Sequence, residues 1–332
     1  MAEDGHRPTR DLVLAELRQA SKFVVLSHEH PDGDALGSLI ATQEILTDMG
    51  KDSVMFIDPQ EFPLPHEYCF LPLPKLIDAP PDDVEERTIV FLDCGNVERT
   101  PAQAFQRPGA HIVNIDHHHD NTNFGTINHV LPDASCTAEI VWDLMHGLQV
   151  TPTPTIAQGL YVGLITDTGR FMYENTTARA HEMAAELIEA GVDVHTIYRR
   201  VYEDVPAGKL ALLSRGLANI ERYDDGRLTV STLHASDFDA TGAVESYSEG
   251  LVDYLRAVQG TTVAALVRER LTNGDGRRSH KVSLRASDDR VDVSRIARVQ
   301  GGGGHRQAAG FDTAMSHEQL VSFLREQLAA QL

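Results

Sequence analysis

The stretch Ser27-His28-Glu29-His30-Pro31-Asp32-Gly33-Asp34 decides how this chain folds. Residues 23–26, just before it, are apolar and partly β-branched, which predicts a short buried strand. Residues 35–49, just after it, carry apolar side chains at helical spacing and stop at Gly50, which predicts a helix. His28, Asp32 and Asp34 therefore lie on a turn between the carboxyl end of a strand and the amino end of a helix. Open α/β sheets bind their ligands at such turns.

Three side chains that can ligate a metal fall within seven residues of this turn. Carboxylates brought close together repel one another and take up protons unless a cation neutralises them. A metal site is therefore the preferred interpretation. The alternative is a solvated polar loop in which Asp34 caps the start of the helix.

The length of 332 residues is enough for two domains. Residues 1–10 are charged and contain no apolar segment typical of a signal peptide, and no apolar run is long enough to span a membrane. The three cysteines, Cys69, Cys94 and Cys136, show no Cys-x-x-Cys spacing, which argues against a disulfide framework and against a cysteine zinc site. We expect a cytoplasmic protein with no membrane partner.

The net charge of −20 is concentrated in one part of the chain. Residues 1–198 carry 11 Lys and Arg against 31 Asp and Glu, and residues 199–332 carry 18 of each. An acidic domain repels a long polyanion. If the substrate contains phosphates, we therefore expect it to be short and not a long nucleic acid tract.

Apolar strands and helical patterns alternate along the first part of the chain. Strands are predicted at residues 53–57, 88–92 and 111–115, and helices at 136–147 and 155–165. This alternation predicts an α/β fold with a mostly parallel sheet and helices on both faces. Residues 58–83 contain seven prolines and are predicted to be an irregular surface excursion.

The pattern changes in the second part of the chain. Residues 177–220 are predicted to be helical, and strands follow at 228–233, 262–270 and 281–285, with a further helix at 292–299. We therefore divide the chain into a catalytic metal-binding domain (1–190), a helical linker or hinge (191–218) and a smaller α+β substrate-binding domain (219–332). We expect the active site in the cleft between the two domains, closed over substrate by the hinge.

Four separate segments offer possible metal ligands where a strand or a helix ends: His28/Asp32/Asp34, Asp93, Asp116/His117 and Asp167. In a parallel sheet these ends meet at one edge. Oxygen-rich sites with a few imidazoles suit Mn²⁺, with Mg²⁺ or Co²⁺ as possible substitutes. Even six of these ligands exceed what one ion takes from side chains, so we expect two ions about 3.5–4 Å apart that share a carboxylate.

Four motifs, in this order, give the chain a family resemblance: Ser27-His-x-x-Pro-Asp-Gly-Asp34, Asp116-His117-His118, Thr166-Asp167-Thr168-Gly169 and Gly301-Gly302-Gly303-Gly304-His305. The set resembles the DHH phosphoesterase superfamily, and more narrowly its nanoRNase and pAp-phosphatase branch. In that branch the catalytic domain is followed by a DHH-associated C-terminal domain. The resemblance covers nearly the whole chain.

The resemblance implies roles for residues of the first domain. His28, Asp32 and Asp93 would hold one ion, and the second would be held by Asp34, Asp93, His117 and Asp167, with Asp93 bridging. Asp116 would orient the neighbouring imidazole. His118 would contact the scissile phosphate or stabilise the leaving group. The family motifs assign no role to His30 or His119.

The resemblance also implies substrate contacts. Gly302, Gly303, Gly304 and His305 match the substrate-binding loop of the family, and glycines let backbone N–H groups approach an anion closely. Arg285 matches a strand arginine that reaches the substrate, and its planar fork suits a phosphate. Arg99 is a further candidate for this contact. Val299-Gln300 departs from the family pattern, in which an aromatic residue or a glycine is common before the glycines.

The function implied by the resemblance is an Mn²⁺-dependent phosphoesterase that acts as a homodimer. Its substrates would be very short oligoribonucleotides, released as nucleoside 5′-monophosphates, or 3′-phosphoadenosine 5′-phosphate. Hydrolysis of cyclic dinucleotides is the alternative. A RecJ-type exonuclease is disfavoured because such an enzyme needs a basic groove and stacking aromatics, whereas only 6% of this chain is aromatic. The glycine-histidine loop argues against an inorganic pyrophosphatase, and a non-catalytic nucleotide sensor is disfavoured because all six ligand positions are present.

Overall fold

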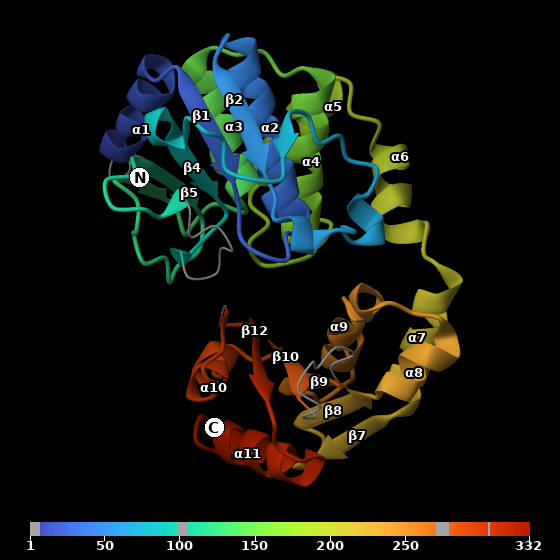
Figure 1. The fold of residues 1–332 in the computed structure, drawn as a ribbon. Coiled ribbons are helices and arrows are strands. Elements are labelled where there is room, and N and C mark those ends of the chain that lie inside the picture. Colours follow the sequence, from blue (N-terminus) through green and yellow to red (C-terminus); the bar gives the residue numbers. More distant parts are fainter. Residues whose placement is uncertain (1–6, 98–104, 270–278, 305) are drawn as a thin grey trace. The chain divides into compact units, whose positions relative to one another are not determined.

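The computed structural model describes residues 7–97, 105–269, 279–304 and 306–332. The chain forms two compact units, Met1–Asp204 and Val205–Leu332 (Figure 1). The boundary after Asp204 falls inside the range predicted as a linker, so the limits 1–190 and 219–332 stay a prediction. Among the described residues, none of the helices combines the length and the apolar character that crossing a membrane would need.

The first unit is built on a six-stranded sheet in which every neighbouring pair of strands is parallel (Figure 1). Its strands are β1 (Lys22–Leu26), β2 (Asp52–Phe56), β3 (Leu76–Ile77), β4 (Thr88–Leu92), β5 (Ile112–Asp116) and β6 (Ile127–Val130). Their order is β3-β2-β1-β4-β5-β6. The chain therefore fills one half of the sheet and then crosses over to fill the other, and the switch point lies between β1 and β4. This is the position at which a doubly wound sheet leaves a crevice at the carboxyl ends of its strands.

The helices of this unit contribute to the core on one face of the sheet. They are α1 (Arg7–Gln19), α2 (Gly33–Asp48), α3 (Thr137–Leu148), α4 (Pro154–Asp167), α5 (Ala178–Glu189) and α6 (Val194–Tyr198), which continues into the π-helical turn η6 (Arg199–Glu203). Phe23 and Val25 of β1 pack into this core. Val24 and Leu26 point to the other face, where they meet Phe105 among other side chains. The predicted parallel sheet with packed helices is confirmed. Helices on both faces were expected, whereas the helices of the described residues pack on one face of this sheet.

The proline-rich stretch 58–83 is more regular than predicted. It contains β3 and two short 3₁₀ turns, η1 (Pro59–Glu61) and η2 (His66–Tyr68), and a third turn, η3 (Val84–Glu86), follows it. β3 adds an edge strand through the pairs Met55–Leu76 and Phe56–Ile77. A strand of two residues is too short to show the alternation by which strands are recognised, so sequence patterns miss it.

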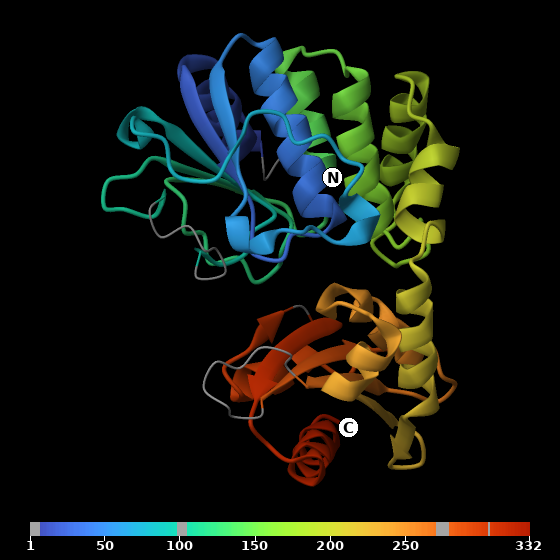
Figure 2. The same ribbon diagram turned by 45° about the vertical axis from the view of Figure 1, so that its right-hand side comes forward.

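The second unit is a mixed sheet with helices on both faces (Figure 2). Its strands, in the order β11-β12-β10-β9-β8-β7, are β7 (Ile220–Tyr223), β8 (Leu228–Leu233), β9 (Val263–Glu269), β10 (His280–Ala286), β11 (Gly303–Gly304) and β12 (Ala308–Thr313). Its helices are α7 (Ala207–Ala218), α8 (Ala235–Thr241), α9 (Leu251–Arg256), α10 (Val293–Val299) and α11 (His317–Ala329), with the 3₁₀ turn η7 (Glu245–Ser248). α10 and α11 pack on one face and α7, α8 and α9 on the other. The α+β expectation for this part of the chain is confirmed.

Close packing of α2 on α4 brings the start of α2 to the end of α4. A Cβ atom on Gly37 of α2 would lie 2.2 Å from the carbonyl oxygen of Gly159 in α4. A Cβ on Gly163, one turn further along α4, would lie 2.8 Å from Oδ1 of Asp34. Only glycine permits these approaches. The two helices therefore meet backbone to backbone next to the candidate ligands.

We predict that Gly37→Ala destabilises the first unit. Helix propensity alone would favour alanine by about 1 kcal/mol. The overlap with the Gly159 carbonyl should outweigh this gain and leave a net loss of about 1–3 kcal/mol. Chemical denaturation measures the change, with Glu44→Ala in the same helix as the control, which should be close to neutral. A stability equal to or above that of the wild type would refute the close-packing account.

Candidate metal centre

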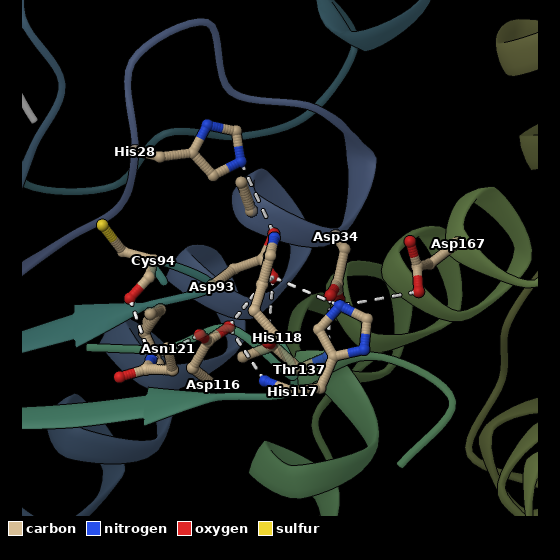
Figure 3. Close-up of polar contacts among 12 residues, drawn as sticks. His28, Asp34, Asp93, Cys94, Asp116, His117, His118, Asn121, Thr137 and Asp167 are labelled. Atoms are coloured by element: carbon tan, nitrogen blue, oxygen red, sulfur yellow. Dashed lines mark hydrogen bonds and ion pairs between the residues drawn. The ribbon is translucent and has the colours of Figure 1, made fainter. Parts of the chain in front are cut away.

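The carboxyl ends of β1, β4 and β5 bring the predicted ligands to one edge of the first sheet (Figure 3). His28 lies just beyond β1, Asp93 directly follows β4, and Asp116 is the last residue of β5. Asp93 has a φ of 56°, a left-handed conformation that is uncommon for a residue other than glycine. Such backbone strain is concentrated at functional sites, where the surrounding structure holds it in place.

The start of α2 places Asp32 and Asp34 differently. Asp32 is the N-cap, and its Oδ1 accepts hydrogen bonds from the backbone N–H groups of Asp34 (3.0 Å) and Ala35 (3.1 Å). The interpretation of Asp34 as a helix cap is therefore wrong. Asp34 lies inside the first turn of α2, is 1% exposed, and faces the candidate site.

The six predicted ligands fall into two groups whose donor atoms lie within 4.8 Å of one another: His28/Asp32/Asp93 and Asp34/His117/Asp167. The groups are adjacent, because His117 Nε2 lies 3.6 Å from Asp93 Oδ1 and 3.7 Å from Asp167 Oδ2. His28 Nε2 lies 3.5 Å from the other oxygen of Asp93. Asp93 thus touches both groups through different oxygens, as a bridging carboxylate would. A third group, Asp93/His117/His118, adds His118 as a possible donor, which the sequence analysis did not consider.

The pKa values of the carboxyl groups in this cluster are shifted because like charges lie close together in a buried place. Burial and the neighbouring carboxylates of Asp93 and Asp167 raise the pKa of Asp34 well above its ordinary value. Burial raises the pKa of Asp167 to about 7, and Asp93 contributes to this rise. Asp93 is also buried, but the surrounding His28, His118 and His117 hold the pKa of its carboxyl far below the usual range.

The two imidazoles respond in the opposite direction. Burial alone would lower the pKa of His28, but its hydrogen bond to Asp93 and the charge of Asp32 raise it to about 9. Likewise, Asp167 and Asp93 outweigh burial and raise the pKa of His117 to about 9. Bound protons therefore compensate the negative charge of the cluster. Divalent cations would do the same by replacing those protons.

The donor set fits hard or borderline divalent cations. Carboxylate oxygens and imidazole nitrogens suit Mn²⁺ or Mg²⁺, with no thiolate within either group. Each carboxylate is also held by an outer partner, as ligands in metal sites are. Asn175 Nδ2, for example, contacts Asp167 Oδ2 at 3.3 Å.

His118 is held by a second hydrogen-bond network. Its Nδ1 lies 2.6 Å from Oδ1 of Asp116, which is fully buried. The other oxygen of Asp116 accepts from Asn121 Nδ2 at 2.5 Å. Because an ionised carboxylate only accepts, the His118 Nδ1 carries the proton in this pair. Asp116 thus contacts the ring of His118 and also accepts from the backbone N–H of His117 at 2.8 Å, and its orienting role stays a prediction.

The remaining predicted residues lie elsewhere. Arg285 is on β10, where its Nε lies 3.3 Å from Asp253 Oδ1. Gly303 and Gly304 form β11 and pair with β12, whose Ala308 is opposite Arg285. Arg285, Gly303 and Gly304 therefore belong to one sheet of the second unit, and Gly302 directly precedes β11. Arg99 and His305 lie outside the described residues.

Three residues that contact predicted site residues were not found from the sequence: Asn121, Thr137 and Asn175. Each is a common polar residue with no motif of its own. The side-chain contacts named here join residues between 5 and 44 positions apart in the chain, and only the folded arrangement brings them together. His30 and His119 are exposed, and His30 Nδ1 lies 2.9 Å from Glu61 Oε2.

The fold and the cluster together define a two-unit α/β protein with a candidate two-ion centre at the switch point of its parallel sheet. Residues 22–164 match the model of the DHH family, N-terminal domain, and residues 226–330 match that of the DHHA1 domain. The chain belongs to the DHH family and carries the DHH and DHHA1 domains in that order.

The similar proteins cover the chain almost end to end. The bifunctional oligoribonuclease and PAP phosphatase NrnA of Thermus thermophilus is 33% identical over 95% of this chain and 94% of its own length. A probable protein of the same name from Streptococcus mutans is 26% identical over 90% and 91%. Among solved structures, an exopolyphosphatase-related protein from Bacteroides fragilis has a TM-score of 0.87 at 23% identity, covering 99% of this chain and 98% of its own, and it shows the same fold.

We predict that divalent cations bind this cluster more tightly as pH rises. His28 and His117, with pKa values of about 9, and Asp167, at about 7, must lose protons before they ligate a metal. Each displaced proton makes the apparent association constant increase by up to about tenfold per pH unit. Calorimetry with Mn²⁺ between about pH 6 and about pH 8 measures this dependence.

Two variants complete that measurement. Asp93→Asn, which removes a charge shared by both groups, should abolish most of the binding. His30→Ala, on the same loop but outside both groups, should bind like the wild type. Binding that weakens as pH rises, or that survives Asp93→Asn unchanged, would contradict the assignment of the cluster as a metal centre.

Proposed function

We propose that the protein is a metal-dependent phosphoesterase that hydrolyses very short oligoribonucleotides to nucleoside 5′-monophosphates and dephosphorylates 3′-phosphoadenosine 5′-phosphate. The observation that carries the proposal is the convergence of six oxygen and nitrogen donors from four chain segments into two adjacent groups. The similar protein from Thermus thermophilus, whose name states both activities, supports the choice of substrates.

In this proposal His28, Asp32 and Asp93 hold one cation, and Asp34, Asp93, His117 and Asp167 hold the other. The cations, with Mn²⁺ proposed as the native one, would neutralise the carboxylates and supply Lewis-acid chemistry at the phosphoryl group. Asp93 keeps the two groups together because each of its oxygens faces a different one. The left-handed backbone of Asp93 is the kind of local strain that is concentrated at functional sites.

His118 is proposed to act on the scissile phosphate. Asp116 holds the His118 ring by its Nδ1, and the proposal assigns proton exchange with the substrate to the other ring nitrogen, Nε2. In this role Nε2 would donate a proton to a phosphoryl or leaving oxygen. This arrangement is that of a general acid with an orienting carboxylate.

The second unit is proposed to bind the rest of the substrate. Arg285 on β10 and the glycines of β11 flank the same strand, β12, and a guanidinium together with backbone N–H groups suits a second phosphate. The ion pair of Arg285 with Asp253 would have to give way or share the arginine when substrate binds. We retain cytoplasmic localisation and a homodimer as proposals from the sequence.

The substrate proposal predicts a length preference. With Mn²⁺, a dinucleotide and a pentanucleotide should be hydrolysed at least about tenfold faster than a single strand of about 24 nucleotides, because the excess of Asp and Glu in residues 1–198 repels a long polyanion. 3′-phosphoadenosine 5′-phosphate should also be a substrate. Release of mononucleotides and of inorganic phosphate, measured by chromatography, gives the rates.

The variant Asp93→Ala should be inactive on every substrate, and His30→Ala should retain full activity. A preference for cyclic di-AMP would replace the proposed substrate while keeping the chemistry. Activity that survives Asp93→Ala, or the absence of any Mn²⁺-dependent turnover, would reject the proposed function.

The role of His118 predicts a separation of binding from turnover. His118→Gln should lower kcat by about 100-fold or more, since general acid–base catalysis contributes about that much. Its affinity for Mn²⁺, measured by calorimetry, should change little, and Asp116→Asn should lower kcat in the same direction. An equal loss of Mn²⁺ binding in His118→Gln would instead make His118 a metal ligand.

A further inference from the structure

The N-terminus of α3 is tied to a carboxylate from a distant part of the chain. The preceding residue, Cys136, makes no side-chain cap, and the first N–H groups of a helix have no partner within the helix. Here Asp34 supplies the acceptor: the backbone N–H groups of Thr137 and Ala138 donate to its Oδ2 (2.7 Å) and Oδ1 (2.9 Å). Both oxygens of Asp34 are thereby held in place by rigid backbone.

The side chain of the same threonine contacts a second candidate ligand. Thr137 Oγ1 donates to Asp93 Oδ1 at 3.0 Å, and both residues are buried (Figure 3). A hydroxyl next to an ionised carboxylate acts as the donor because the carboxylate has no proton to give. Thr137 therefore joins Asp34 through its main chain and Asp93 through its side chain.

The neighbouring residues extend this contact to a third carboxylate. The carbonyl oxygen of Ser135 accepts from Asn175 Nδ2 at 2.8 Å, and the same Nδ2 contacts Asp167 Oδ2 at 3.3 Å. The segment 135–138 is thus linked to one carboxylate from the first group of candidate ligands and to two from the second. These carboxylates repel one another, so they need such links to stay at a fixed separation.

We propose that Thr137 is a positioning residue of the metal centre, whose hydroxyl fixes the orientation of Asp93 relative to Asp34. The inference rests on the metal centre proposed above. The hydroxyl occupies one lone pair of Asp93 Oδ1 and so restricts how this carboxylate rotates between the two groups of ligands. Groups that orient metal ligands in this way typically change metal affinity by about 10–100-fold when they are removed.

The test is the affinity of the full-length protein for Mn²⁺, measured by calorimetry. Thr137→Val keeps the shape of the side chain and loses only the donor, and we expect its dissociation constant to rise by about 10–100-fold. Thr137→Ser restores the hydroxyl and should bind close to the wild-type level. Thr42→Val is the matched control: Thr42 is a buried threonine of α2 whose Oγ1 has no hydrogen-bond partner among the described residues. Its Mn²⁺ affinity should not change.

Thermal unfolding in EDTA separates positioning from a purely structural role. A purely structural role would lower the melting temperature of Thr137→Val in EDTA and leave the Mn²⁺ affinity of the folded protein unchanged, which would overturn the inference. If Thr137→Val does not fold, the pair Thr137→Ser and Thr137→Ala makes the same comparison with smaller side chains.

The results separate the role of Thr137 from the existence of the metal centre. Weak Mn²⁺ binding by Thr137→Val or Thr137→Ala, with normal binding by Thr137→Ser and Thr42→Val, supports the positioning role. Normal binding by all variants overturns the role of Thr137 and leaves the metal centre intact. Absence of Mn²⁺ binding by the wild type overturns both.

Discussion

The first unit of this protein depends on holding several carboxylates close together in a buried place. Asp34 and Asp93 are almost completely buried, and Asp167 lies next to them. In water these groups would repel one another and separate. Here the neighbouring charges raise the pKa values of His28 and His117, and burial raises those of Asp34 and Asp167. All four shifts favour bound protons, which reduce the negative charge of the cluster. Divalent cations bound at these carboxylates would neutralise the same charge.

Short hydrogen bonds to rigid backbone keep these carboxylates close together. The backbone N–H groups at the start of α3 hold Asp34, and Asp32 holds the start of α2. Glycine at position 163 leaves room for the Asp34 carboxylate next to α4. A flexible loop would let these groups move apart and relieve their repulsion. Helix termini and helix–helix contacts do not, because their positions are set by the packed core.

The division of the chain into two units matches a division of chemistry. The excess of acidic residues lies in residues 1–198, which supply the candidate metal ligands, and residues 199–332 are balanced in charge. The acidic part suits cations, and the second unit offers an arginine and a glycine-rich strand edge that suit phosphates.

Much of the site could be predicted because its ligands follow recognisable strands. His28, Asp93 and Asp116 each come after an apolar run, and parallel strands end at a common edge. The motifs around Asp34, His117 and Asp167 added specificity. Other features had no signal in the sequence. The exchange of the capping role from Asp34 to Asp32 depends on where the first helical turn begins, and such a boundary is decided by one or two residues.

By itself the sequence determined the strand–turn–helix order, the parallel sheet and the six donor positions, because these follow from local periodicity and from residue type. Only the tertiary structure decided which oxygens face which group, why Asp93 takes a left-handed backbone, and that Thr137 contacts Asp34 and Asp93 at once. Thr137 lies 103 residues from Asp34 and 44 from Asp93. Contacts over such separations arise from helix and sheet packing, to which each residue contributes a small part, and no local pattern encodes them.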